Sequence, residues 1–177
     1  MMTEPGIPES QRRQIYFGNT VQFLVLSRRL AATRTLGVPY VVISIVDSHE
    51  SFPDAEIALS PLRRGVLRLR FDDVDAECTG AEYQPFSQAM ATQIIRFVAP
   101  YAQRGVSGVI VHCAQGISRS SAVAACLSQW LNSEATDFFD EFFSPNPTVR
   151  TILSRTIAIM EPEVFREENS HNTLHQP

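Results

Sequence analysis

Residues 111–121 read VHCAQGISRSS, and the fold prediction rests on them. It begins at the end of a short apolar run, 107–112, and leads into a segment whose apolar residues fall at helical spacing. A strand followed by a tight loop and a helix is typical of layered α/β domains. Ligands of such domains bind at the carboxyl ends of parallel strands. The sequence therefore predicts a ligand-binding loop at 113–119.

Apolar patterns in the rest of the chain predict the elements around this loop. Further strands are expected near 21–25, at 40–46 and at 65–71, and helices near 28–35, at 86–103, directly after the loop, near 134–143 and near 148–160. The run at 40–46 is continuously apolar, as expected for a strand buried on both faces. The predicted fold class is α/β, with a mostly parallel central sheet flanked by helices.

Length and composition indicate one cytoplasmic domain. The chain has 177 residues, of which we assign 13–160 to the catalytic domain, 1–12 to a flexible N-terminus and 161–177 to a polar C-terminal tail. The net charge of −4 disfavours nucleic acids and anionic membranes as partners. The N-terminal residues are polar and the chain contains no apolar run of the ~18 residues that span a bilayer.

Two features of the composition exclude several chemistries. All 15 basic residues are arginine, so lysine Schiff bases, pyridoxal phosphate and Walker-type loops are excluded. The three cysteines include no Cys-x-x-Cys pair, which argues against a disulfide scaffold and against a cysteine-rich zinc site. We expect no metal and no cofactor.

Cys113 is the predicted nucleophile. It lies where a strand gives way to a helix, and the positive end of a helix dipole lowers a thiol pKa from about 8.5 toward the range ~3.5–7.5. Gly116 permits the left-handed backbone that lets the loop amides curl around an anion. The predicted substrate-binding residues are Ala114, Gln115, Gly116, Ile117, Ser118 and Arg119.

Three neighbours of Cys113 complete the predicted phosphate site. Arg119 can form two hydrogen bonds to phosphate oxygens, and Ser120 can offer its hydroxyl to the sulfur when the sulfur leaves. His112 can orient the loop or hold the thiolate. Donors arranged around a thiolate suit a tetrahedral oxyanion, so the predicted reaction is phosphoryl transfer to Cys113 followed by hydrolysis.

The leaving group needs a proton, and the acidic segment 72–82 is the predicted source. Asp73 is the first choice as general acid and then as general base toward water. Asp72 and Asp75 are the alternatives.

At these residues the chain resembles the cysteine-based protein tyrosine phosphatase superfamily, whose signature is His-Cys-x5-Arg-Ser/Thr. The segment HCAQGISRS fits every fixed position of that signature. The size is similar to the dual-specificity-like branch, particularly its small bacterial or phage members, in which a Phe-x-Asp element like Phe71-Asp72-Asp73 precedes the acid loop. The resemblance implies Cys113 as nucleophile, Arg119 as phosphate ligand, Ser120 as hydroxyl donor and Asp73 as acid.

The predicted function is therefore hydrolysis of phosphotyrosine in a protein or peptide, with phosphoserine and phosphothreonine as further substrates. One alternative is a phosphatase of RNA 5′-phosphates, nucleotides or inositides; the loop lacks the lysine often present in inositide phosphatases of this superfamily. Another is a non-catalytic phospho-binding module. A sulfurtransferase fits less well, since such loops need no arginine six residues after the cysteine.

Overall fold

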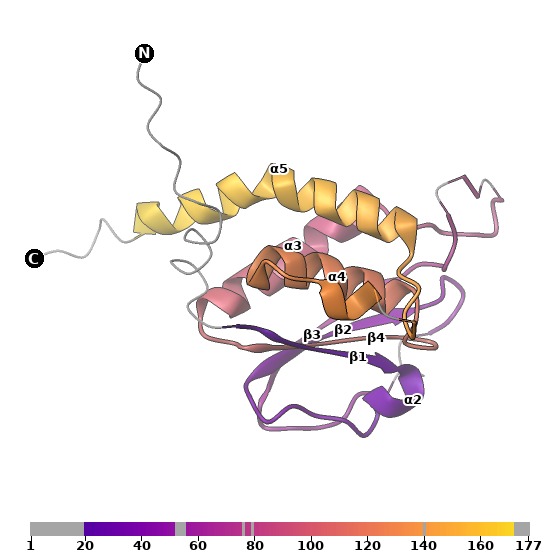
Figure 1. Cartoon of the computed structure of the whole chain (residues 1–177), viewed down its shortest axis with the longest axis horizontal. Coiled ribbons are helices and arrows are strands. Elements are labelled where there is room, and N and C mark those ends of the chain that lie inside the picture. The colour runs from indigo at the N-terminus through magenta and orange to yellow at the C-terminus, as the bar shows by residue number, and fades with distance from the viewer. Residues whose placement is uncertain (1–19, 52–55, 76, 79, 140, 172–177) are drawn as a thin grey trace, which may run out of the picture.

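The computed structural model describes residues 20–51, 56–75, 77–78, 80–139 and 141–171 (Figure 1). These residues form a four-stranded parallel sheet in the order β1-β4-β2-β3. Its strands are β1 (Gln22–Ser27), β2 (Tyr40–Val46), β3 (Arg63–Arg70) and β4 (Gly108–Cys113). Because β4 lies between β1 and β2, its carboxyl end opens between two neighbouring strand ends.

Helices cover the two faces of this sheet unequally (Figure 1). One face carries α3 (Gln88–Gln103) and α4 (Arg119–Asn132), and α5 (Pro147–His171) packs on both of them as an outer layer. The short α2 (Arg28–Ala31) lies on the opposite face, beside β1 and β4. The α/β class with a parallel sheet is confirmed.

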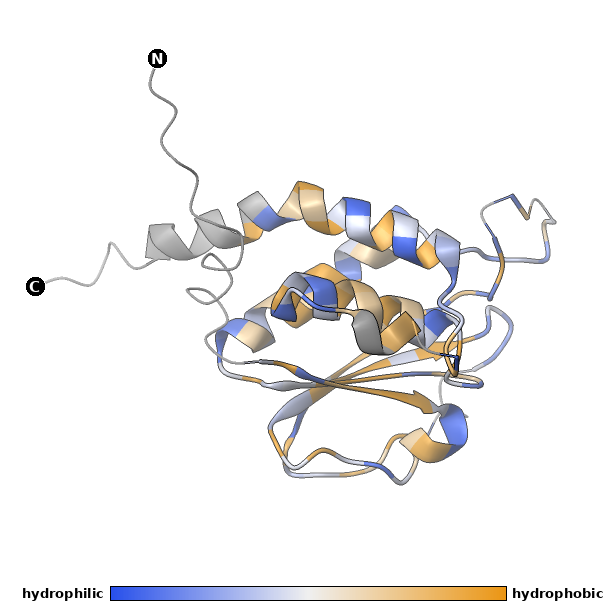
Figure 2. Cartoon of the chain, viewed as in Figure 1, coloured by the Kyte–Doolittle hydropathy of each residue, from blue (hydrophilic) through white to orange (hydrophobic). Residues whose placement is uncertain are grey.

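The central strands are buried on both faces. Every residue of β2 and β4 is buried. Ile43 and Val111 belong to the larger core cluster, under α3 and α4, whereas Val42 and Ile110 belong to the smaller cluster on the α2 face. Figure 2 shows apolar residues along these strands and on the helix surfaces that face them. Burial on both faces explains why the strand at 40–46 is continuously apolar.

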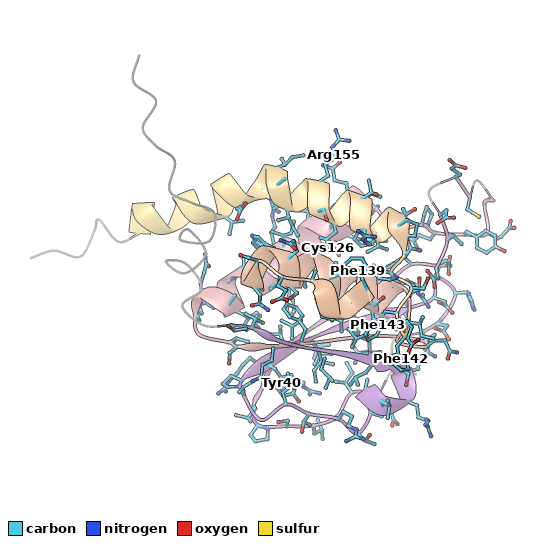
Figure 3. The ribbon with its side chains drawn as sticks, viewed as in Figure 1. Tyr40, Cys126, Phe139, Phe142, Phe143 and Arg155 are labelled. Carbon is cyan, nitrogen blue, oxygen red and sulfur yellow. The ribbon has the colours of Figure 1, made fainter. Side chains whose placement is uncertain are left out.

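The expected strands are all present, but the helix expected near 134–143 is wrong. Only a single 3-10 turn, η2 (Thr136–Phe139), forms there. The chain then leaves the helical path, so that the Ser144 N–H donates to the Ile117 carbonyl at 3.1 Å. Figure 3 shows Phe142 at the end of the sheet where β1 meets α2. Docking of this segment on the 113–119 loop has replaced local helical hydrogen bonds.

The last helix is longer than expected. It begins at Pro147 and continues to His171, so part of the segment 161–177, expected as a tail, is helical. Residues 1–12, expected as a flexible N-terminus, lie outside the described part of the chain. The assignment of 13–160 as the catalytic domain remains a prediction. Within the described residues, none of the helices has the length and apolar character needed to cross a bilayer.

Candidate active site

The 113–119 loop connects the end of β4 to the start of α4. Gly116 has a φ of +76°, in the left-handed region. A Cβ on Gly116 would lie 2.5 Å from the Leu26 carbonyl carbon and 2.6 Å from the Ser27 nitrogen. The Arg28 N–H donates to the Ala114 carbonyl at 3.3 Å. Glycine is therefore required both by backbone angle and by space, because the loop rests on the end of β1.

The Cys113 sulfur lies inside this loop and is almost wholly buried, with 2% of the residue exposed. Its Sγ is 3.1 Å from the Ser120 Oγ and accepts a hydrogen bond from the Gly116 N–H at 3.3 Å. Burial raises the pKa of the thiol, but hydrogen bonds from Ser120 and Gly116 and the charge of Arg119 outweigh burial and leave the pKa below its ordinary value. The thiolate is thus more favourable here than in an ordinary cysteine.

Arg119 is buried at the first position of α4. Its Nη1 donates to the Phe71 carbonyl at 2.8 Å and to the Asp47 Oδ1 at 2.5 Å. Its Nε is buried and has no hydrogen-bond partner among the described residues. One edge of the guanidinium is therefore fixed by protein oxygens, while the Nε–H is available to an oxyanion.

Asp47 is a site residue that the sequence interpretation missed. It directly follows β2, and its carboxylate orients Arg119, which lies 72 residues further along the chain. The available signal was its place at the carboxyl end of a buried strand next to β4, where ligand sites of parallel sheets form.

The structure separates the three candidate acids. The buried Asp72 accepts hydrogen bonds from the Ser48 N–H at 2.9 Å and the Gln84 N–H at 2.8 Å. Burial raises the pKa of the Asp72 carboxyl, but these two donors outweigh burial and leave it below its ordinary value. Asp72 therefore joins two surface loops. Asp75 is exposed and, with Glu77, lines a cavity of about 360 Å³ beside the start of α5.

Asp73 is the candidate that the fold brings to the 113–119 loop. Its Oδ1 accepts hydrogen bonds from the Ser118 Oγ and from the Asn146 Nδ2, both at 2.8 Å. Asp73 is exposed, so its carboxyl group is open to a ligand above the loop. Asn146 was also missed by the sequence interpretation. The available signal was an asparagine directly before a proline at a helix start.

His112 does not form a hydrogen bond with the sulfur. Its side chain is wholly buried, and neither ring nitrogen has a hydrogen-bond partner among the described residues. Burial, reinforced by the charges of Arg28 and Arg68, lowers the pKa of His112 to about 4. The ring is therefore neutral near pH 7.

The remaining predicted loop residues differ in their exposure to solvent. Gln115 and Ile117 are exposed, while Ala114 and Ser118 are partly buried. Ser120 is buried, with its hydroxyl on the sulfur.

Two further cysteines are free thiols away from this arrangement. Cys126 lies between α4 and α5, with its Sγ 3.3 Å from the Ser154 Oγ (Figure 3), and burial raises its pKa. Cys78 is exposed. In the described ranges, no three His, Cys, Asp or Glu side chains are grouped so that they could hold a metal ion.

Solved structures of other proteins resemble this chain in fold. No protein-family model matches the chain, and no curated protein matches it either. The crystal structure of human DUSP28 has 18% sequence identity to this chain and a TM-score of 0.51. The match covers 80% of this chain and 94% of the DUSP28 chain. The crystal structure of a mouse putative dual specificity phosphatase complexed with zinc tungstate has 16% sequence identity and a TM-score of 0.50. That match covers 77% of this chain and 82% of the mouse chain. The chain therefore shares the fold of these two solved structures.

Proposed function

We propose that this chain is a cysteine-dependent phosphatase that hydrolyses phosphotyrosine in proteins, with phosphoserine and phosphothreonine as further substrates. One observation carries the proposal. A buried sulfur with two hydrogen-bond donors, the unpartnered Nε of Arg119 and the carboxyl group of Asp73 all converge on one loop. Each component alone has a structural explanation, but together they supply a nucleophile, an oxyanion ligand and a proton donor.

In the first step, the Cys113 thiolate attacks phosphorus opposite the ester oxygen. The sulfur–phosphorus bond forms as the phosphorus–oxygen bond breaks, and Asp73 gives its proton to the departing oxygen. The loop amides and the Arg119 guanidinium stabilise the charge on the three remaining oxygens. Asp47 and the Phe71 carbonyl hold the guanidinium in place before the substrate arrives.

In the second step, water attacks the phosphocysteine. The Asp73 carboxylate accepts the proton from this water, and the sulfur leaves as a thiolate. The Ser120 hydroxyl, 3.1 Å from Sγ, stabilises the leaving sulfur by a hydrogen bond. Inorganic phosphate departs and the enzyme returns to its starting state.

The shape and charge of the site favour a protein substrate. The sulfur is buried within the loop, so the phosphate must be carried by a substrate side chain long enough to reach it. The exposed loop residues Gln115 and Ile117 are uncharged, whereas Asp75 and Glu77 are exposed on the acid segment. The additional phosphates of an inositide, a nucleotide or an RNA would therefore find no cation within the loop besides Arg119, which is assigned to the phosphate being transferred. The proposed location is the cytoplasm, where phosphorylated proteins and reduced thiols are found.

The test is hydrolysis of p-nitrophenyl phosphate and of phosphotyrosine, phosphoserine and phosphothreonine peptides, compared with an inositide and a 5′-nucleotide. The expected result is turnover of the aryl ester and the tyrosine peptide, abolished in Cys113→Ser and inhibited by tungstate. Tungstate is present in the mouse neighbour. Activity that survives in Cys113→Ser would refute the mechanism. Binding of phosphopeptide without turnover would favour a phospho-binding module, and preference for the inositide or nucleotide would change the substrate class.

A further inference from the structure

Asn146 is a polar residue buried where three segments meet. Only 4% of it is exposed, although it lies between the acid segment, the 113–119 loop and α5. Its backbone N–H donates to the Ser118 carbonyl at 3.2 Å. Its side-chain Oδ1 accepts a hydrogen bond from the Val149 N–H at 3.0 Å, which caps the N-terminus of α5. These two bonds fix the position of Asn146 from both sides.

The amide nitrogen of the same side chain faces the acid segment. Nδ2 donates to the Asp73 Oδ1 at 2.8 Å and lies 3.4 Å from the Val74 carbonyl oxygen, which accepts its second hydrogen. Asp73 and Asn146 are 73 residues apart in the chain, so only the tertiary structure brings them together. The acid segment is thus joined to the start of α5.

We propose that Asn146 is the positioning residue for the Asp73 general acid. This inference rests on the proposed phosphatase function. Both hydrogen bonds to Asp73, from Ser118 and from Asn146, end on Oδ1. They orient the carboxyl group so that Oδ2 carries the proton. During phosphoryl transfer this proton moves from Oδ2 to the ester oxygen as the phosphorus–oxygen bond breaks, and the alcohol leaves neutral.

The choice of asparagine follows from the two roles of its side chain. The helix cap needs an oxygen acceptor, which Ser, Thr, Asp or Asn can supply. The bond to Asp73 needs an N–H donor on the same side chain, which Asp cannot supply. Asn146 therefore meets both requirements with one side chain held rigidly at the start of a helix.

Asn146→Ser separates these roles, because serine keeps a cap acceptor for the Val149 N–H but is too short to replace the amide at Asp73. The measurement is kcat/KM for aryl phosphates whose leaving groups range from acidic phenols to phenol itself. A misplaced acid matters most when the leaving group is basic. We expect a loss on the order of tenfold for phenyl phosphate and little change for the most acidic phenol, with thermal stability retained.

A double-mutant cycle with Asp73→Asn identifies the route of the effect. If Asn146 acts through Asp73, Asn146→Ser causes no further loss in the Asp73→Asn background. Equal losses for all leaving groups, or losses that multiply with Asp73→Asn, would overturn the inference. If the serine variant does not fold, Asn146→Asp serves instead, because aspartate keeps the helix cap and places a like charge beside Asp73. If the Asn146→Asp variant shows the wild-type dependence on the leaving group, the inference is also overturned.

The two proposals fail in different ways. A wild-type protein that hydrolyses none of the esters refutes the phosphatase function itself. A wild-type protein that hydrolyses them, with an Asn146→Ser variant indistinguishable from it for every leaving group, refutes only the positioning role.

Discussion

Replacing Ser120 by alanine should raise the pKa of the Cys113 thiol, because the thiolate loses the hydrogen bond from the Ser120 hydroxyl. The Ser120 Oγ is 3.1 Å from Sγ, and this hydrogen bond leads the interactions that lower the pKa. A hydrogen bond to a charged group contributes about 1.5–3 kcal/mol, and one pKa unit corresponds to about 1.36 kcal/mol. The Gly116 N–H and the charge of Arg119 remain, so the variant keeps part of the shift.

The assay is the rate of Cys113 alkylation by iodoacetamide as a function of pH, followed by mass spectrometry of the labelled peptide. Cys113→Ser provides the background from Cys78 and Cys126. The acidic limb of the kcat/KM profile should move upward by the same amount, because less thiolate is present at a given pH. The phosphocysteine should also accumulate, giving a burst of released phenol. A Cys113 pKa that is unchanged or lower in Ser120→Ala would refute this account of the thiolate.

Two further predictions concern the loop and the buried histidine. Gly116→Ala should lower kcat/KM on the order of a hundredfold, because its Cβ would clash with the backbone of Leu26 and displace the loop; an active variant with an unchanged affinity for tungstate would contradict this close packing. His112 should make the protein less stable as pH falls from about 6.5 to about 4, because in this window the unfolded chain takes up the proton and the folded chain does not. The loss is about 3 kcal/mol in the free energy of unfolding measured with urea, and a His112→Gln variant that loses stability equally over this window would show that another group is responsible.

The acid assignment shows what local sequence could and could not settle. Asp72, Asp73 and Asp75 lie within four consecutive residues, and composition gives no reason to separate them. The fold separates them, because Asp72 turns toward Ser48 and Gln84 while Asp73 turns toward Ser118. The chain bends at Asp73, shortly after the end of β3, and the neighbouring carboxylates of Asp72 and Asp73 reach different partners.

The helix expected near 134–143 failed for a related reason. Its four phenylalanines gave a local pattern compatible with a helix, but the segment is held by contacts with residues far away in the chain. Phe138 packs edge-to-face on Phe23 of β1, with ring centroids 6.2 Å apart, and Ser144 bonds to the loop. Tertiary packing overrides weak local propensity in short segments.

The proposed nucleophile and its immediate surroundings could be identified from sequence alone. Cys113, Gly116 and Arg119 lie within seven consecutive residues, so a strand, a turn and a helix in succession suffice to place them together. Which carboxylates meet these residues could not be read from the sequence and depends on how the chain folds. Asp47 and Arg119 are 72 residues apart, and Asp73 and Asn146 are 73 apart, so these pairs depend on strand order and on the docking of α5. Residues close together in sequence are placed by local backbone geometry. Residues far apart meet only after the strands and helices have packed, and that packing is driven by the burial of apolar surface from the whole chain.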